Sequence, residues 1–427
     1  MTATVLFVSL VVLLILNVPV GIAIGLSCVV TILSFGTLSE LYVAQTLVSA
    51  TDSFPIMAIP LFILAGDLMG AGGVSRRILG VASAFFGRFT GGLAIVTVVV
   101  CMFFAAVSGS GPATVAAVGS MVVPTMLEAG YSKSFVLALV AAAGSIGVII
   151  PPSIPMVLYG VSTGTSISNM FLGGVLPGLL IGLVLITYAY FYSRKMGWKG
   201  DDTPFDGRRT LCLVWEAKWA LLNPVIILGG IYAGIFTPTE AAAVAAVYAF
   251  VCGVFIHREL SPRDIFKTIA GSCATTGTVM VILGCASTFA RILTIEQIPV
   301  AIADFMLQFS SSPAVLLLVI LVMLLLVGCV MDTTPAILVL SPILYPVATS
   351  MGIDPVHFGI VMVVSLAIGF ITPPLGINLF VASRIGNASL GTVIKGIVPF
   401  VIVMILTLLV IAYVPQLSLV LLSVFSG

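Results

Sequence analysis

Residues 146–152 read Ile-Gly-Val-Ile-Ile-Pro-Pro, and residues 368–374 read Ile-Gly-Phe-Ile-Thr-Pro-Pro. Both stretches end apolar runs, and a Pro-Pro pair interrupts a helix because proline lacks the N–H group and clashes with the preceding turn. The two stretches lie 222 positions apart. Eight residues recur at this spacing: Pro124, Gly130, Ile146, Gly147, Pro151, Pro152, Gly174 and Pro177 are matched by Pro346, Gly352, Ile368, Gly369, Pro373, Pro374, Gly396 and Pro399. Because most of the matches are helix breakers, they indicate an internal repeat rather than a chance similarity of apolar residues.

The composition predicts that this repeat lies in a membrane. Of the 427 residues, 60% are hydrophobic and 7% are charged, whereas about 25% of the residues of a soluble domain are charged. Apolar runs long enough to cross roughly 30 Å of hydrocarbon recur along the chain. We therefore expect an all-α polytopic membrane protein, with residues 4–33 as its retained first span. The net charge is +1, and no segment concentrates Lys and Arg on one polar face, so no nucleic-acid partner is expected.

Basic residues in the connecting segments predict the orientation of each repeat, because Lys and Arg stay mainly on the cytoplasmic side. In the first repeat, residues 72–91 are basic, residues 161–170 are uncharged and residues 193–218 carry six basic residues, which predicts inside, outside, inside. The matching segments of the second repeat are acidic, basic and uncharged, at 293–313 (Glu296 and Asp304), 383–395 and 415–427. The two repeats are thus expected to cross the membrane in opposite senses.

Each repeat also contains two short apolar helices joined by a polar break. They are expected at 96–108 and 114–125 in the first repeat, and at 314–327 and 336–346 in the second. We interpret each pair as a re-entrant hairpin, which is followed by a span broken at the Pro-Pro pair and then by a further span. With the remaining apolar runs, the sequence predicts roughly nine full crossings and two hairpins.

Paired, interrupted hydrophobic segments are typical of secondary transporters. We expect an elevator-type ion transporter, in which the hairpins and broken helices slide as one compact group past fixed spans. The expected division is 1–92 for N-terminal scaffold spans, 93–170 for the first transport unit, 171–292 for scaffold spans with a cytoplasmic linker at 193–218, 314–395 for the second transport unit, and 396–427 for a C-terminal scaffold span.

The helix breaks are the expected ion sites, because an unpaired backbone group in a membrane is costly unless a helix, a water molecule or a ligand satisfies it. Neutral oxygens with few carboxylates suit Na⁺ better than Ca²⁺, which prefers several carboxylates. The alternative is that Ser and Gly at the breaks only permit close helix packing, but two matched breaks favour ion binding. The expected sodium-binding residues are Ser108, Ser110, Gly147, Ile150, Pro152, Gly328, Thr333, Gly369, Thr372 and Pro374. Na⁺ is the only metal expected, and no cofactor is expected.

The hairpin tips also predict an anion site, because a helix N-terminus favours negative charge. We expect the second arms to begin near Ala113 and Ala336 with free N–H groups. A carboxylate substrate held between the two tips would contact Ser108, Ser110, Thr114, Thr333 and Thr334.

Ionisable residues at membrane depth are few, and each is a functional candidate because intramembrane charge is costly. Asp332 lies in the second tip, where direct contact with a ligand and a structural hydrogen bond are both open. Arg291 precedes that hairpin, and its alternatives are substrate contact and snorkelling to the interface. Asp67 and Glu240 are interpreted as structural.

Three stretches of the sequence resemble those of a known protein family. They read Pro-Leu-Phe-Ile-Leu-Ala-Gly at 60–66, Gly-Gly-Ile-Tyr-Ala-Gly-Ile-Phe-Thr-Pro-Thr-Glu-Ala-Ala-Ala at 229–243, and Thr-Pro-Pro-Leu-Gly-Ile-Asn at 372–378. These resemble the large membrane subunit of tripartite ATP-independent periplasmic (TRAP) transporters, and the resemblance covers essentially the whole chain. It implies a multi-pass protein of the bacterial inner membrane that takes up an organic acid by a sodium-driven elevator.

The resemblance also implies partners and site residues. A small four-helix membrane subunit would enlarge the scaffold within the lipid bilayer, and a periplasmic solute-binding protein would deliver the substrate. Some members fuse the small subunit to the large one, and we expect a separate chain here. The family's two sodium sites fall on the breaks named above, and Arg291 and Asp332 are placed near the substrate. Sialic acid and C4-dicarboxylates are the first substrates to test.

Two other classes of function compete with this interpretation. A passive channel-like pore for small anions could also place two hairpins at mid-membrane. A membrane-embedded enzyme would need a His cluster, an H-E-x-x-H motif or a nucleophile beside a base, and the apolar runs contain none. We therefore expect no enzyme. The sequence has no G-x-x-x-x-G-K-[ST] phosphate loop, so we expect transport to draw on an ion gradient or on a partner, and the gradient is the simpler interpretation.

Overall fold

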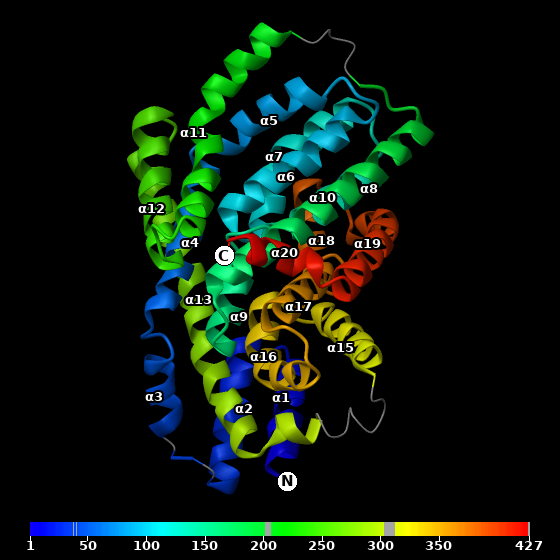
Figure 1. Ribbon diagram of the computed structural model, residues 1–427. Helices are drawn as coiled ribbons and strands as arrows, with labels where there is room; N and C mark the ends of the chain where they lie inside the picture. Colours follow the sequence, from blue (N-terminus) through cyan, green and yellow to red (C-terminus); the bar gives the residue numbers. More distant parts are fainter. Residues whose placement is uncertain (37, 40, 201–205, 303–311, 426–427) are drawn as a thin grey trace.

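The computed structural model describes residues 1–36, 38–39, 41–200, 206–302 and 312–425. Within these ranges the chain forms helices joined by turns, with no strand. Asp304 and the middle of the 193–218 segment, residues 201–205, lie outside the described residues. Figure 1 shows the helices packed as a long bundle, with the N-terminus at one end.

One group of helices comes from residues 1–86 and 207–295. These are α1 (Thr2–Ile15), α2 (Val20–Phe35), α3 (Leu41–Ser49), η1 (Phe54–Met57), α4 (Ala58–Ala71), α5 (Val74–Phe86), α11 (Gly207–Tyr232), α12 (Pro238–Val251), η3 (Cys252–Ile256) and α13 (Pro262–Ile295). Within the group α4 packs most extensively on α12, and α13 packs on α2, α3 and α4. Capping boxes start the last two long helices, with Thr237 and Glu240 on α12 and Ser261 and Asp264 on α13.

A second group contains both hairpins and both Pro-Pro breaks. From the first repeat it takes α6 (Gly92–Ser108), α7 (Gly111–Glu128), α8 (Lys133–Ser145), η2 (Ile146–Val148), α9 (Ile154–Thr163) and α10 (Ile167–Met196). From the second it takes α15 (Pro313–Gly328), α16 (Thr333–Ser350), α17 (Pro355–Gly369), α18 (Ile377–Ile385), α19 (Leu390–Tyr413) and α20 (Gln416–Phe425). The two repeats meet inside this group, where α8 packs on α19 and α9 packs on α16.

The two hairpins lie toward opposite ends of the molecule. In Figure 1, α6 and α7 (cyan) occupy the upper half, and α15 and α16 (yellow to orange) occupy the lower half. The α10 and α19 helices, expected in the scaffold, pack on the hairpin group: α10 contacts α6 and α17, and α19 contacts α8 and α17. Between the two groups the main contacts are α5 with α6, α13 with α16 and α4 with α6.

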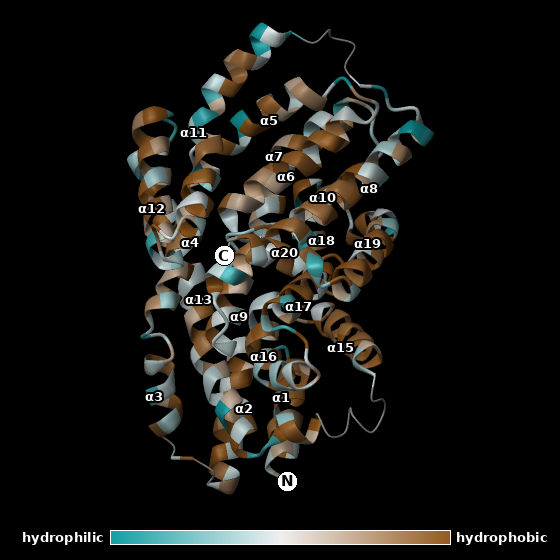
Figure 2. Ribbon diagram, viewed as in Figure 1, coloured by the Kyte–Doolittle hydropathy of each residue, from teal (hydrophilic) through white to brown (hydrophobic). Residues whose placement is uncertain are grey.

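The helices have the length and polarity of a multi-pass membrane protein. Seven helices of the described residues are long and apolar enough to cross a membrane, and shorter apolar helices include α6, α8, α9, α15 and α17. Figure 2 shows hydrophobic residues along most helices, and hydrophilic residues where α10 ends and α11 begins. The protein is therefore a multi-pass membrane protein, as the composition predicted.

Two expected boundaries differ in the structure. Residues 4–33 form two helices, not one span, because the chain turns at Asn17, which has a positive φ of 60°, and Pro19 starts the next helix. Helix also occupies most of 193–218, since α10 continues to Met196 and α11 begins at Gly207, where Asp206 caps the free N–H groups of Arg208 and Arg209.

Candidate functional site

The first hairpin tip is a compact turn whose oxygens face one another. Gly109 ends α6 in the left-handed conformation (φ 61°), and Ser110 caps α7. The Thr114 hydroxyl donates to the Ser110 carbonyl at 2.8 Å, and its oxygen lies 3.0 Å from the Ser108 hydroxyl oxygen. Three residues expected to bind sodium or substrate are thus brought together.

The first helix break packs directly against this tip. A Cβ added to Gly147 would lie 2.5 Å from the Thr114 hydroxyl oxygen and 2.6 Å from the Ser110 carbonyl oxygen, so only glycine permits this approach. A Cβ added to Gly109 would lie 2.9 Å from the Pro152 carbonyl oxygen. The Pro151–Pro152 peptide bond is cis. Ile150 lies in the same break, and its side chain packs toward Gly178 of α10.

The second tip and the second break have a similar close contact. A Cβ added to Gly369 would fall against the backbone of Gly328, where α15 ends. The Leu375 N–H donates to the Cys329 carbonyl at 3.1 Å, which ties the tip to the break. The Thr372 hydroxyl donates to the Ile368 carbonyl at 2.8 Å. The Pro373–Pro374 bond is cis, like its counterpart.

A cavity of about 270 Å³ separates the two tips, and we call it the tip cavity. The first repeat contributes Ser110 and Pro112, and the second contributes Asp332, Thr333 and Thr334. Its remaining lining residues are Ile63, Gly109, Val148, Ile154, Pro155, Thr275, Thr278, Val279, Ile282 and Phe370. Among the described residues that line it, Asp332 has the only charged side chain. The cavity therefore favours a cation over an anion.

Asp332 itself occupies the helix N-terminus at the second tip. Its carboxylate accepts from the Thr334 N–H at 3.4 Å and from the Thr333 hydroxyl at 3.2 Å. Both helices begin earlier than expected. The Ala336 N–H donates to the Asp332 carbonyl at 3.1 Å, and the Ala113 N–H faces the Ser110 hydroxyl at 3.5 Å. The prediction of free N–H groups at Ala113 and Ala336 is therefore wrong.

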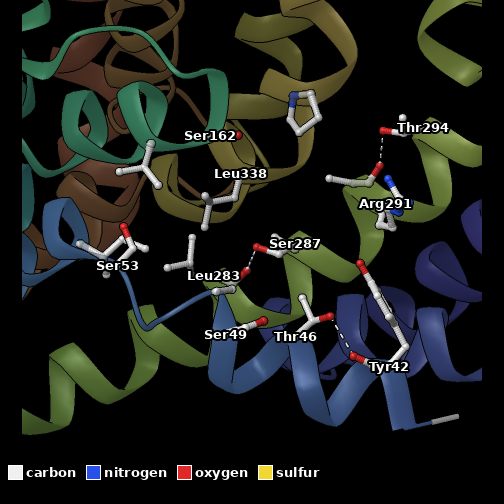
Figure 3. A pocket seen from close by; sticks show the side chains of 16 residues that line it. Tyr42, Thr46, Ser49, Ser53, Ser162, Leu283, Ser287, Arg291, Thr294 and Leu338 are labelled. Atoms are coloured by element: carbon white, nitrogen blue, oxygen red, sulfur yellow. Dashed lines mark hydrogen bonds between the residues drawn. The ribbon is translucent and has the colours of Figure 1, made fainter. Parts of the chain in front are cut away.

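Arg291 does not reach the tip cavity. It lines a second cavity of about 520 Å³, the Arg291 cavity, between α3 and α13 on one side and α9 and α16 on the other. Figure 3 shows its guanidinium among hydroxyl side chains. At about 1.5 Å of rise per residue, it lies roughly 20 Å along α13 from Thr278 of the tip cavity. Among the described residues, Arg291 forms no ion pair and no side-chain hydrogen bond.

The hydroxyl residues of the Arg291 cavity were not predicted from the sequence. They are Tyr42, Thr46, Ser49, Ser53, Ser162, Ser287 and Thr294. A Ser or Thr in an apolar helix commonly bonds to the carbonyl four residues earlier, as Thr46, Ser287 and Thr294 do. Helical periodicity on α3 and α13 could have placed some of them on one face, but only tertiary packing shows that the two faces meet.

Asp67 and Glu240, which the sequence analysis interpreted as structural, each accept a hydrogen bond from a neighbouring helix residue or cap. Asp67 accepts from the Ser272 hydroxyl at 2.6 Å and lines a third cavity of about 650 Å³ with Ala113 and Thr268. Glu240 accepts from the Thr237 N–H at 2.8 Å in the capping box of α12. Within the part of the chain that the structure describes, no group of three His, Cys, Asp or Glu side chains is arranged to hold a metal ion.

Comparison with known proteins agrees with this architecture. Residues 7–417 match the family described as the tripartite ATP-independent periplasmic transporter, DctM component. The chain belongs to this family. It is 43% identical over 440 residues to the C4-dicarboxylate TRAP transporter large permease protein DctM of Vibrio cholerae, covering 98% of this chain and 97% of that protein. It is 37% identical over 412 residues to the sialic acid TRAP transporter large permease protein SiaM of the same organism, covering 95% and 96%.

Another relative of this DctM-family chain is longer. The isethionate TRAP transporter permease protein DctMQ of Oleidesulfovibrio alaskensis is 52% identical over 402 residues, which are 94% of this chain and 63% of that protein. The chain thus spans less than two thirds of the length of this relative. Among solved structures, the fold resembles that of the Alcanivorax borkumensis YdaH transporter, with a TM-score of 0.62, 18% identity, and coverage of 87% and 88% of the two chains.

Proposed function

We propose that this protein takes up an organic acid across the bacterial inner membrane and couples that uptake to Na⁺. The observation that carries the proposal is the tip cavity, where two hairpin tips and two helix breaks meet around neutral oxygens and one carboxylate. A weakly held monovalent cation suits such a ligand set. The relatives are named for isethionate, C4-dicarboxylate and sialic acid, and each of these is an organic anion.

Two sodium sites are proposed, one at each tip-and-break contact. The first is formed by Ser108, Ser110, Gly147, Ile150 and Pro152. The second is formed by Gly328, Thr333, Gly369, Thr372 and Pro374. In both, the approach of glycine backbones brings carbonyl and hydroxyl oxygens to the broken helix, where bound Na⁺ would satisfy carbonyl groups that the break leaves without helical partners.

The substrate site divides into two parts in this proposal. The carboxylate or sulfonate of the substrate binds in the Arg291 cavity at Arg291, which has no ion-pair partner among the described residues. The residues Ser108, Ser110, Thr114, Asp332, Thr333 and Thr334 adjoin the coupling ion, and they form a second proposed contact region, which a small acid at Arg291, roughly 20 Å away along α13, does not reach at the same time. An anion held next to Asp332 alone would be repelled, so bound Na⁺ neutralises this end first.

The elevator mechanism is supported by the seam between the two helix groups. Three cavities follow one another along α13, the first lined by Thr268, the second by Thr278 and the third by Arg291. Such loose packing permits one group to slide past the other. In this proposal α10 and α19 move with the hairpins, because α10 packs on α6 and α19 packs on α8. The moving group is then larger than the predicted transport units, residues 93–170 and 314–395. Inverted repeats, with one hairpin entering from each side, complete the mechanism.

The proposed partners are a small membrane subunit and a periplasmic solute-binding protein. The family description names a tripartite periplasmic transporter. Whether the small subunit is a separate chain stays a prediction of the resemblance, and one relative is named as the permease protein DctMQ.

Transport by reconstituted protein tests the function. Proteoliposomes containing the full chain and the small subunit are given an inward Na⁺ gradient, with and without the binding protein, and uptake of labelled sialic acid, a C4-dicarboxylate and isethionate is measured. Saturable uptake that needs both Na⁺ and the binding protein is expected. Uptake that neither saturates nor needs Na⁺ would instead identify a passive pore.

A further inference from the structure

We propose that a cavity between α5 and α11 binds the headgroup of phosphatidylethanolamine, a lipid that carries one phosphate and one primary ammonium group. The cavity has a volume of about 240 Å³, and we call it the Arg76 cavity. Its lining residues are Arg76, Arg77, Gly80, Leu213, Glu216 and Glu259. The proposed transport cycle does not use this cavity, so the inference goes beyond the proposed function.

The charged side chains of the Arg76 cavity leave one cation and one anion for a ligand. Arg77 pairs with Glu259 at 2.8 Å, so these two charges neutralise each other. Arg76 reaches the same carboxylate at 4.0 Å, and its side chain is 76% exposed. Glu216 is exposed and has no ion-pair partner in the described part of the chain, and the Cys212 thiol donates to it at a long 3.7 Å. A ligand can therefore use the Arg76 guanidinium and the Glu216 carboxylate together.

This pair of charges matches a zwitterion that contains phosphate and ammonium. The guanidinium of Arg76 can bind two phosphate oxygens in a bidentate manner. A primary ammonium has three N–H donors, which the carboxylate of Glu216 can accept. The choline group of phosphatidylcholine has no N–H donor, and the glycerol group of phosphatidylglycerol has no positive charge. Phosphatidylethanolamine is therefore the headgroup that satisfies both side chains.

The charge pattern of α11 places the cavity at the depth of lipid headgroups. Beyond Lys218 the helix carries no charged residue to its end, and at about 1.5 Å of rise per residue this apolar part spans roughly 20 Å of the ~30 Å of hydrocarbon. Trp215 and Trp219 flank Glu216, and tryptophan is enriched where hydrocarbon meets water. The Lys218 ammonium lies 3.4 Å from the centroid of the Trp215 ring and does not line the cavity. Because α5 and α11 both begin in segments rich in Lys and Arg, the leaflet is the cytoplasmic one.

The outer side of α11 can accommodate the acyl chains of the same lipid. Among the seven candidate spans of the described residues, α11 is the least buried. Its exposed large apolar side chains include Leu211, Trp215, Leu222 and Val225. Figure 1 shows α5 beside α11, and a Cβ added to Gly80 would lie 3.6 Å from Leu213, so the two helices meet closely at the cavity. A headgroup bound by Arg76 of α5 and Glu216 of α11 would stabilise this contact.

Lipids that differ only in the headgroup test the inference on the unmodified protein. The full chain is purified with and without the small subunit, and bound lipid is counted by native mass spectrometry after exposure to dioleoyl phosphatidylethanolamine, its N-methyl and N,N-dimethyl forms, phosphatidylcholine and phosphatidylglycerol. We expect phosphatidylethanolamine to be retained about fivefold more than phosphatidylcholine, as for one exposed charge-assisted contact. Retention should fall with each N–H that a methyl group replaces. In nanodiscs, phosphatidylethanolamine should also raise the melting temperature relative to phosphatidylcholine.

Two variants identify the residues responsible. Glu216→Gln removes the partner of the ammonium, so the preference for phosphatidylethanolamine over phosphatidylcholine should fall toward one while phosphatidylglycerol is retained as before. Arg76→Gln removes the partner of the phosphate, which all the lipids carry, so retention of each should decrease. Arg208→Gln is the matched control, because Arg208 is exposed on the same helix but does not line the cavity. It should keep the preference of the unmodified protein.

Several results would overturn the inference. One is equal retention of phosphatidylethanolamine and phosphatidylcholine by the unmodified protein, and another is an unchanged preference in Glu216→Gln. If soluble phosphoethanolamine raises the melting temperature as much as the lipid does, the cavity binds a soluble zwitterion instead. If the small subunit abolishes the preference, that partner covers the cavity. Because none of these measurements reads uptake, their failure would leave the proposed function unaffected.

Discussion

Thr372 places a hydroxyl oxygen at the second helix break, with its proton directed to the Ile368 carbonyl at 2.8 Å. The oxygen lone pairs are therefore available to a cation. Thr372→Ala removes this ligand, which is worth about 0.5–1.5 kcal/mol for one neutral contact. We expect the Na⁺ concentration for half-maximal uptake to rise between about two- and tenfold, with uptake partly restored at high Na⁺.

The same measurement on Ser108→Ala probes the first break, where its hydroxyl lies 3.0 Å from that of Thr114. Thr187→Ala is the control, since Thr187 makes the same kind of bond to the Leu183 carbonyl on an exposed part of α10. Unchanged Na⁺ dependence in both break variants would show that the ions bind elsewhere.

His257 gives a pH dependence outside the membrane spans. Its Nδ1 lies 3.0 Å from the Gly72 carbonyl oxygen, and burial, followed by the nearby Arg77, lowers the pKa of the imidazole below 6.5. The unfolded chain therefore binds this proton more readily, so stability is fully present above about pH 6.5 and is lost as the pH falls below it. We expect a lower apparent melting temperature at about pH 5 than at about pH 7.5, and a smaller difference in His257→Gln. An equal difference in both proteins would assign the effect to other groups.

At the residue level, the sequence offered Asp332 and Arg291 as functional candidates, but it did not show where they lie relative to each other. The cost of charge in a membrane makes each residue a functional candidate, and the family resemblance implies that both lie near the substrate. The structure places them in different cavities, and their separation depends on the run of α13 between the two groups, which no local pattern reveals.

At the scale of helices, the close packing of each hairpin tip against its helix break requires glycine at the contact. Gly369→Ala would place a methyl group against the Gly328 backbone, and Gly147→Ala would place one 2.5 Å from the Thr114 hydroxyl oxygen. Because backbone cannot yield cheaply, we expect each variant to lose about 1–3 kcal/mol of stability and to bind Na⁺ more weakly. Melting temperature and Na⁺-dependent uptake measure the two effects.

Gly277→Ala is the matched control, since a Cβ there meets no atom within 4 Å and alanine favours the exposed helix α13. If Gly369→Ala were as stable and as active as this control, the close approach of hairpin and break would not be needed for the sodium site.

Breaker residues explain why the hairpins and broken helices could be predicted. Gly and Pro act through local backbone geometry, so Gly109 and the two Pro-Pro pairs identify interruptions directly. Helix starts were predicted less well, because Ser110 and Asp332 extend their helices backward by capping N–H groups. The partners of α10 and α19 depend on tertiary packing, and the sequence therefore placed these helices with the scaffold.

For the whole molecule, the inverted arrangement can be tested at two matched surface positions. Glu128 ends α7 and Ser350 ends α16, both are exposed, and they correspond through the repeat. With the native cysteines removed, we expect Glu128→Cys to label only from the cytoplasm and Ser350→Cys only from the periplasm. Labelling of both from one side would contradict inverted repeats.

Sliding of the hairpin group past the scaffold is the central motion of the proposed mechanism. Ala290 on α13 and Leu338 on α16 line the same cavity from opposite sides of the seam. Cysteines at these positions, joined by a short bifunctional thiol reagent, should abolish uptake because the substrate and its ions must travel inside the moving group to remain shielded from hydrocarbon. Na⁺ binding should persist, since the tips and breaks are not touched.

A second crosslink tests which helices move together. Ser134 on α8 donates to the Thr392 carbonyl on α19 at 2.8 Å, so cysteines at these two positions join the first repeat to α19. If α19 travels with the hairpins, this crosslink leaves uptake intact, whereas a stationary α19 would make it as inhibitory as the first. Full uptake through the Ala290–Leu338 crosslink would instead exclude the elevator, because a group fixed to α13 cannot carry its cargo across the membrane.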